Sequence, residues 1–287
     1  MSIYTTALLL GLAYAALGIG IFISMRIFRI PDITTDGSFT LGGAVTASLT
    51  TALFPTGWTW MAVFLAGTVA GAVTGWIHTK LRVNALLAGI LVSTGLYSIN
   101  LAIMGRPNIP LIDTPNLFSL LTDSPADWQS QAMVLGVFAL LLILSMNHLL
   151  RSDFGLAMRA TGNNETMARA AGISVDRMKI IGLALSNGLV AVSGYLIVCI
   201  QAYADINMGI GIVILGLGSV MIGEIPGKLM KKESMLAKLI GVLTGSILFR
   251  MILGWTLSIG VDPLYLKLVV ALFVLAAVGL PQLSKRA

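Results

Sequence analysis

Three aspartates stand beside or within apolar stretches, and they are the first residues to consider for chemistry. Asp32 and Asp36 belong to the run PDITTDGSF, and Asp205 precedes a short apolar segment together with Asn207. Ionisable side chains at membrane depth are energetically expensive and usually functional, as solute ligands or as coupling carboxylates of ion-driven transport. The alternative is that these residues end loops at the membrane interface, and the sequence leaves both interpretations open.

A second group of polar residues lies inside apolar segments. Ser93, Tyr97 and Asn100 are spaced i, i+4 and i+7, which places them on one helix face. Asn187 lies near the middle of a later apolar segment. Such side chains face other protein or a water-filled path, so interhelical hydrogen bonding and a substrate path are the two explanations. The candidate substrate-pathway residues are Asp36, Ser93, Tyr97, Asn100, Asn187, Asp205 and Asn207.

Residues arranged for catalysis are missing from the sequence. A hydrolase needs a nucleophile with a base, or a metal held by several ligands. The two histidines, His78 and His148, have no ligand set around them, and no HExxH, GxSxG or P-loop pattern occurs. We therefore expect no enzyme activity and no cofactor in this chain. If ATP drives it, another chain binds the ATP and Mg²⁺.

The elements that position these residues must belong to a membrane protein. Of the 287 residues, 57% are hydrophobic and only 10% are charged, whereas soluble chains carry about 25% charged residues. The net charge of +6 does not require a nucleic acid partner, because the basic residues fall at the ends of apolar runs, as the positive-inside rule describes. The composition therefore predicts a protein that crosses the lipid bilayer several times.

Nine apolar segments are candidates for membrane helices. A spanning helix needs about 20 mostly apolar residues, so we predict an all-α bundle of about 8–10 transmembrane helices in one domain, residues 1–287. Two of the segments, Ser38–Leu53 and Met208–Ile222, are short enough to be half-helices or broken helices. The nine segments are Tyr4–Met25, Ser38–Leu53, Trp58–His78, Asn84–Met104, Gln131–Leu150, Met178–Ala202, Met208–Ile222, Leu236–Leu257 and Leu264–Gly279.

Lys and Arg residues gather on one side of the expected bundle. The longest stretch without a membrane-length apolar run is Arg151–Lys179, here called the central polar segment. If this segment is cytoplasmic, alternation of the spans leaves only Arg106, Arg250 and Lys267 outside, of 18 Lys and Arg residues. Because cytoplasmic loops carry the excess of Lys and Arg, we predict an external N-terminus and a cytoplasmic C-terminus.

The longest external loop is Gly105–Ser130. Its four prolines exclude a long regular helix. Short amphipathic pieces such as Leu117–Leu121 can lie along the membrane surface. A docking site for an external partner and a simple connector both remain open for this loop.

The sequence contains a weak internal repeat. The pattern Asp-Ile, then Gly, then Leu-Gly occurs at 32–42 and again at 205–216, each time after a segment with Gly-Leu-Ala near its start. The two segments run in opposite directions in the predicted topology. This is the signature of an inverted repeat with the transport pathway between the halves, and chance similarity in a Gly- and Leu-rich chain is the alternative.

The central polar segment is expected to fold as helix, turn, short helix, turn, helix. Gly162 is suited to end the first helix, and Asn163 or Asn164 to cap a short helix over Glu165–Ala171, which Gly172 would end. A helix of two turns is marginal alone in water. It therefore needs a partner whose groove receives its small side chains, or it rests on the membrane surface.

Three stretches carry a resemblance to a known family. They are LGLAYAALGIGIFISMRIFRIPDITTDGSFTLGGAVTASL, then FGLAMRATGNNETMARAAGISVDRMK, then SNGLVAVSGYLIVCIQAYADINMGIGIVILGLGSVMIGE. In this order and spacing they resemble the permease subunit of ATP-binding-cassette (ABC) importers, within the branched-chain amino acid and ribose permease family. The run DITTDGSF is most similar to a subgroup linked to uptake of aromatic amino acids such as tryptophan or tyrosine.

The resemblance implies a set of partners and a coupling helix. It implies two cytoplasmic ATPase subunits that bind ATP and Mg²⁺, an extracytoplasmic solute-binding protein, and a second permease copy in the lipid of a bacterial inner membrane. The solute would be an amino acid or a related small polar metabolite. The alternative is an ion-coupled secondary transporter that uses Asp32, Asp36 or Asp205. The residues that the resemblance places against the ATPase are Glu165, Thr166, Met167, Ala168, Arg169, Ala170, Ala171, Gly172 and Ile173.

Overall fold

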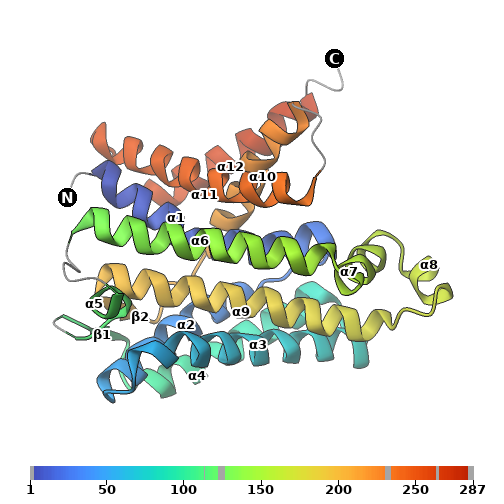
Figure 1. Ribbon diagram of the computed structural model, residues 1–287, viewed down its shortest axis with the longest axis horizontal. Helices are drawn as coiled ribbons and strands as arrows, with labels where there is room; N and C mark the ends of the chain where they lie inside the picture. Colours follow the sequence, from blue (N-terminus) through green and yellow to red (C-terminus); the bar gives the residue numbers. More distant parts are fainter. Residues whose placement is uncertain (1–2, 113, 122–126, 230–233, 263–264, 284–287) are drawn as a thin grey trace.

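Long helices make up most of the protein and lie along its longest axis (Figure 1). The structure, a computed structural model, describes residues 3–112, 114–121, 127–229, 234–262 and 265–283. The elements in chain order are α1 (Ile3–Ile21), η1 (Phe22–Ile27), α2 (Thr34–Thr51), α3 (Thr56–Lys80), α4 (Ala85–Met104), β1 (Asn108–Pro110), α5 (Leu117–Leu121), α6 (Trp128–Arg151), α7 (Asp153–Asn163), α8 (Glu165–Ala170), α9 (Val175–Gln201), β2 (Tyr203–Asp205), α10 (Ile212–Leu229), α11 (Met235–Ser258) and α12 (Leu266–Leu283).

Membrane-length helices confirm the predicted fold class. Among the described residues, six helices are long and apolar enough to cross a bilayer: α1 with η1, α3, α4, α6, α9 and α11. Helices α10 and α12 contain shorter apolar stretches, Ile212–Ile225 and Leu266–Leu275. Each of the nine predicted segments overlaps one helix, except that Tyr4–Met25 covers both α1 and η1, and the two segments expected to be short correspond to α2 and α10.

Those two helices begin at other residues than predicted. Helix α2 begins at Thr34 instead of Ser38, because Asp32 Oδ1 accepts a hydrogen bond from the Thr34 amide at 2.9 Å and so satisfies its first turn. Helix α10 begins at Ile212 instead of Met208, after turns over 206–211. The polar residues around 32–36 therefore surround a helix N-terminus, and those around 205–211 precede one.

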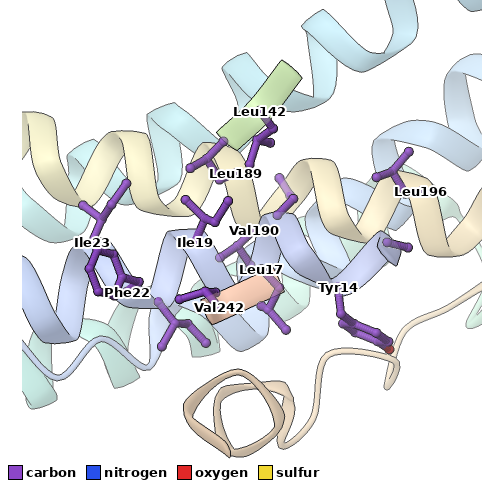
Figure 2. Close-up of a cluster of buried hydrophobic side chains, with 14 of the residues drawn as sticks. Tyr14, Leu17, Ile19, Phe22, Ile23, Leu142, Leu189, Val190, Leu196 and Val242 are labelled. Atoms are coloured by element: carbon purple, nitrogen blue, oxygen red, sulfur yellow. The ribbon is translucent and has the colours of Figure 1, made fainter. Parts of the chain in front are cut away.

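Helices α1 and α9 form the centre of the bundle and run antiparallel. Ser186 Oγ of α9 donates to the Gly20 carbonyl of α1 at 2.7 Å, and Ser193 Oγ donates to the Ala13 carbonyl at 2.9 Å. The most apolar windows of the two helices are 78% and 89% buried. Their buried hydrophobic side chains interdigitate, as Figure 2 shows for residues from Leu17 to Ile23 of α1 and η1 and from Leu189 to Leu196 of α9.

The packing around this pair has the symmetry that an inverted repeat requires. Helices α2 and α3 pack on α9, whereas α10 and α11 pack on α1. Helix α4 then covers α2, and α12 covers α10. One half consists of α1 to α4 and the other of α9 to α12. In each half, the second and third helices pack on the first helix of the other half. Together with the antiparallel α1 and α9, this arrangement supports the inverted repeat over chance similarity.

Glycines on α3 allow it to approach α9 closely. A Cβ atom at Gly71 would collide with the Leu183 carbonyl, and one at Gly75 would lie 2.7 Å from Ile180 Cα. Small residues at four-residue spacing permit such close helix packing in membranes.

The loops after α4 and α9 meet in a two-stranded sheet that the sequence did not predict. Strand β1 pairs antiparallel with β2, with Asn108 opposite Asp205 and Pro110 opposite Tyr203. The predicted amphipathic piece Leu117–Leu121 is helical and forms α5. The pairing connects the loop after α4 with the loop after α9, so it links the two repeats at this end of the molecule.

Candidate functional site

The central polar segment leaves the bundle as two helices, and one predicted boundary was wrong. After α6 ends at Arg151, Ser152 Oγ accepts from the Gly155 amide at 3.4 Å and begins α7. Helix α7 continues through Gly162, which was expected to end it. A Cβ atom at Gly162 would collide with the Ile27 carbonyl at the end of η1. This glycine therefore permits close contact between backbones instead of ending a helix.

The short helix α8 is capped at both ends as predicted. Asn164 is the capping residue, because its Oδ1 accepts from the Met167 amide at 3.0 Å, whereas Asn163 closes α7. At the other end Gly172 has φ +80°, a left-handed conformation that favours glycine. The helix is one residue shorter than expected, because Ala171 is its C-cap.

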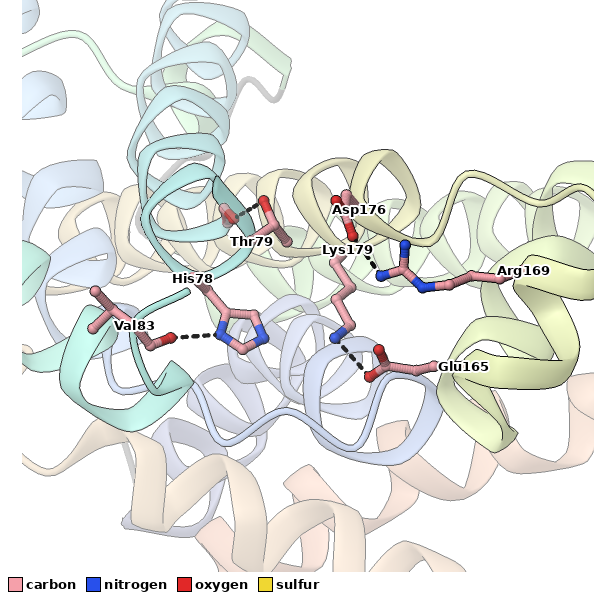
Figure 3. A network of polar contacts seen from close by, with 8 residues as sticks. His78, Thr79, Val83, Glu165, Arg169, Asp176 and Lys179 are labelled. Carbon is pink, nitrogen blue, oxygen red and sulfur yellow. Dashed lines mark hydrogen bonds and ion pairs between the residues drawn. The ribbon is translucent and has the colours of Figure 1, made fainter. Parts of the chain in front are cut away.

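Two ion pairs hold α8 against the first turns of α9 (Figure 3). Glu165 Oε1 lies 2.6 Å from Lys179 Nζ, and Arg169 Nη2 lies 2.8 Å from Asp176 Oδ1. The side chain of Lys179 is only 12% exposed, so its position is well defined. An exposed ion pair contributes at most about 1 kcal/mol to stability. We infer that the pairs serve mainly to fix the orientation of α8 relative to α9.

The exposed residues Met167, Ala170 and Ala171 form an apolar face of α8 that has no partner in the described part of the chain. Ala168 is buried under α8 at 2% exposure, whereas the Met167 side chain is 72% exposed. Ala170 and Ala171 are exposed as well. Of the nine residues predicted to contact an ATPase, Ala168 faces the protein and Ile173 is half-buried. The other seven are exposed: Glu165, Thr166, Met167, Arg169, Ala170, Ala171 and Gly172.

A histidine at the end of α3 lies near these ion pairs but has a local partner. His78 Nδ1 is 2.9 Å from the Val83 carbonyl, and the neighbouring Thr79 Oγ1 donates to the Gly75 carbonyl at 2.8 Å (Figure 3). Within the described ranges, no group of three or more His, Cys, Asp and Glu side chains could hold a metal ion. His78 therefore fixes the turn between α3 and α4.

Asp32 and Asn187 belong to one buried hydrogen-bonded cluster. Asn187 Nδ2 donates to Asp32 Oδ2 at 2.7 Å, and Ser38 Oγ donates to Asn187 Oδ1 at 2.7 Å. All three side chains are at most 1% exposed. The cluster joins the N-terminal end of α2 to the middle of α9. The sequence left interhelical hydrogen bonding and a substrate path open for Asn187. In this conformation its side chain makes interhelical hydrogen bonds.

Asp36 caps a helix of the other repeat. Its Oδ2 accepts from the Gly211 amide and its Oδ1 from the Val213 amide, both at 3.0 Å. The first amides of a helix have no partner within the helix and carry a partial positive charge. The carboxylate therefore stabilises the start of α10 from a position in α2.

The polar face of α4 is divided by its packing. Asn100 is buried and its Nδ2 donates to the Gly37 carbonyl at 3.2 Å, while its Oδ1 has no hydrogen-bond partner. Ser93 is half-buried beside the same glycine of α2, whereas Tyr97 is 49% exposed. The three residues thus do not form one continuous surface.

Asp205 ends β2 and Asn207 lies in the turn that follows, away from the buried cluster. Asp205 Oδ1 accepts from the Asn207 amide at 2.8 Å, and its Oδ2 accepts from Asn108 Nδ2 at 3.2 Å. They close the turn after β2 and join it to β1. The seven predicted pathway residues are therefore spread over the α2–α9 contact, the α2–α10 contact, α4 and the region of the β1–β2 sheet.

Sequence reasoning missed a charged residue inside the bundle. Arg250 was counted only as an external basic residue, but it lies on α11, and its guanidinium carbon is 4.0 Å from the centre of the Tyr14 ring. The available signal was a single charge inside an apolar run.

The comparison with protein families decides the identity. Residues 3–279 match the family model described as "Branched-chain amino acid transport system / permease component". The chain belongs to this family. As a permease of an ABC importer it is a multi-pass membrane protein and not an enzyme. Membership also implies ATPase partners, and it does not favour the ion-coupled alternative.

Relatives of the permease cover nearly the whole chain. The "Tyrosine transport system permease protein" of Clostridioides difficile (strain R20291) is 35% identical over 96% of this chain and 89% of the relative. The "Ribose import permease protein RbsC" of Escherichia coli (strain K12) is 25% identical over 86% of this chain and 75% of the relative. An ABC transporter of metal-chelate type, solved in an inward-facing conformation, matches with a TM-score of 0.53 and 17% identity over 97% of this chain and 83% of that chain. This last likeness concerns the fold alone.

Proposed function

We propose that this permease moves an amino acid or a related small polar solute into the cytoplasm. A solute-binding protein delivers the solute outside, and separate ATPase subunits bind α8 and drive transport by hydrolysing ATP. Two copies of the chain form the membrane part. The membrane is the bacterial inner membrane, with the N-terminus outside and the C-terminus in the cytoplasm.

The single observation that carries this proposal is the construction of α8. This helix is capped at both ends, held by two ion pairs, and presents an apolar outer face that nothing in the described chain covers. A short helix of this kind needs contacts beyond itself to be stable. A cleft of a soluble partner supplies such contacts, and Met167 and Ala170 are suited to enter it.

The connection of α8 to the bundle supports a mechanical role. The ion pairs attach α8 to α9, and α9 is a 27-residue helix in the centre of the fold, about 40 Å long. A movement of α8 is therefore transmitted to the contact between α9 and α1, where the two repeats meet. Rocking of one repeat against the other is the general way in which such transporters change access.

The charge distribution supports the proposed orientation. Helix α3 ends at Lys80 and α6 ends at Arg151, both at the end of the bundle from which α7 and α8 project (Figure 1). Arg26 lies at this end as well, paired with Glu224 of α10 at 2.6 Å. Basic residues favour the cytoplasmic side.

The proposed solute class is supported by the similarity to a tyrosine transport permease at 35% identity. The run DITTDGSF supports it as well, because it resembles a subgroup linked to uptake of aromatic amino acids. Ribose permeases in the same family show that the family name alone does not define the solute.

The decisive experiment is co-purification of the permease with its ATPase. Ala170→Trp and Ala170→Asp should abolish ATPase binding and solute uptake, because each puts a large or charged group on the exposed face of α8. Ala160→Trp is the matched control, since Ala160 is an exposed alanine on α7 and outside the predicted contact. Undiminished binding and uptake in both Ala170 variants, with the protein inserted normally, would overturn the assignment of α8.

A further inference from the structure

Arg250 lies deep in the membrane-spanning part of the molecule. Helix α11 has 24 residues, and Arg250 precedes its last residue by eight positions, which corresponds to about 12 Å along the helix. Its contact Tyr14 lies near the middle of the 25-residue span Ile3–Ile27. One turn away, Ser246 Oγ donates to the Gly11 carbonyl at 2.9 Å and holds the two helices in this register.

The guanidinium group is held in place by two stacked aromatic rings. The carbon of the guanidinium is 4.0 Å from the centre of the Tyr14 ring. Tyr14 stacks on Phe39 with 5.9 Å between ring centres and 7° between planes. Figure 2 shows Tyr14 at one end of the buried aliphatic cluster, beyond Leu17. The stack joins α11, α1 and α2, which belong to both repeats.

The charge of Arg250 has no counter-ion in the described part of the chain. Its Nε atom is buried without a hydrogen-bond partner, and no described ion pair includes it. Asp36 lies one turn before Phe39 on α2, but both of its oxygens accept amides of α10. An arginine near the bilayer centre is destabilising by more than a single cation–π contact usually offsets. Arg250 as a whole is half-buried, so a guanidinium group at this depth without a counter-ion indicates that an anion binds here during function.

We propose that Arg250 binds the carboxylate of the transported solute between the two repeats. The proposal rests on the proposed function and makes the solute class more specific, namely a solute with a carboxylate. A guanidinium group binds a carboxylate with two parallel hydrogen bonds. Tyr14 and Phe39 act as positioning residues, because the stack fixes the plane in which those hydrogen bonds form.

The depth of the site favours a solute over a lipid headgroup as the source of the anion. Headgroups lie outside a hydrocarbon core about 30 Å thick, whereas the guanidinium group is fixed over Tyr14 near the middle of its span. Arginines that reach headgroups do so from near the ends of helices. A solute that is transported between the repeats must pass through this depth.

The test is equilibrium binding of radiolabelled L-tyrosine to the full chain in lipid nanodiscs. Wild-type protein should bind it saturably at a concentration of about 1 mM or below, and Arg250→Gln should weaken binding by about 10-fold or more. Arg250→Lys, which retains the charge but not the two-pronged geometry, should fall between. Lys267→Gln is the matched control, because it removes an exposed basic residue of α12 and should change nothing.

Competitors distinguish the chemical groups that the site recognises. 4-Hydroxyphenylpropionate, which retains the carboxylate and lacks the amine, should displace L-tyrosine, whereas tyramine, which lacks the carboxylate, should not. Nanodiscs with and without anionic lipid should give the same result, and displacement by anionic lipid alone would assign the site to headgroups and overturn the proposal. Equal binding by Arg250→Gln and wild type, displacement by tyramine, or no saturable binding by wild type would each overturn it as well. The assay contains no ATPase, so failure here is distinct from failure of α8 to bind its partner.

Discussion

The bond between Asp36 and α10 gives a perturbation with a local readout. Asp36→Ala removes the acceptor of the Gly211 and Val213 amides, which lie at 3.0 Å from the two carboxylate oxygens. A hydrogen bond to a charged group contributes about 1.5–3 kcal/mol, and two bonds to one carboxylate are not additive. We expect the start of α10 to lose about 2 kcal/mol of local stability, which corresponds to about 30-fold more frequent opening.

Hydrogen–deuterium exchange of the detergent-purified protein measures this opening. Peptides that cover residues 209–216 should exchange about 30-fold faster in Asp36→Ala than in wild type. Asp36→Asn, which retains one carbonyl acceptor, should lie between the two. Asp153→Asn is the control, because Asp153 is an exposed first-turn residue of α7, where Ser152 already supplies the cap.

The result that refutes the reasoning is equally local. If residues 209–216 exchange at the wild-type rate in Asp36→Ala while the protein remains folded, water or another group satisfies the amides of α10. The carboxylate would then be unnecessary for the start of this helix.

Two further predictions concern the end of the bundle from which α7 and α8 project. Gly162→Ala should lower the midpoint of thermal unfolding of the purified protein, because overpacking against the Ile27 carbonyl costs about 1–3 kcal/mol. Gly95→Ala is the control, because a Cβ atom there would meet no atom within 4 Å. Equal midpoints for the two variants would contradict the close contact. Lys179→Met should reduce solute-stimulated ATP hydrolysis while ATPase binding persists, because the ion pair with Glu165 orients α8 and contributes at most about 1 kcal/mol to stability. The neighbouring Arg177→Met removes an exposed charge outside these pairs, and identical stimulation in the two variants would mean that α8 needs no such anchor.

Local signals were sufficient for most of the fold. The lengths of the apolar runs predicted the nine helical segments, since every helix that crosses the bilayer needs a long run of apolar residues. The ends of α8 were predictable because Asn164 and Gly172 satisfy the backbone within a few residues of themselves. These features depend on near neighbours in sequence, and a single sequence contains that information.

The remaining features depend on neighbours that are distant in sequence. Gly162 was misassigned because the atom that requires a glycine there is the Ile27 carbonyl. The pairing of Asn108 with Asp205 joins two three-residue strands, too short for a recognisable pattern. The aromatic partner of Arg250 is Tyr14, far away in sequence on another helix. Hydropathy identifies helices, but it does not describe how each helix is rotated against its neighbours.

The β1–β2 sheet gives α9 a second attachment, at the end opposite α8. Helix α9 is paired with α8 at its N-terminal end and continues through Ala202, with φ +55°, into β2, which pairs with β1. One rigid element therefore joins the face that an ATPase would bind to the loops that an external protein would meet. Suppose that a ligand at one end of α9 favours one of two positions of this helix and so changes the affinity for a ligand at the other end. Thermodynamic reciprocity then requires that the second ligand change the affinity for the first by the same factor. Binding measured on one side of the membrane then reports the state of the other side.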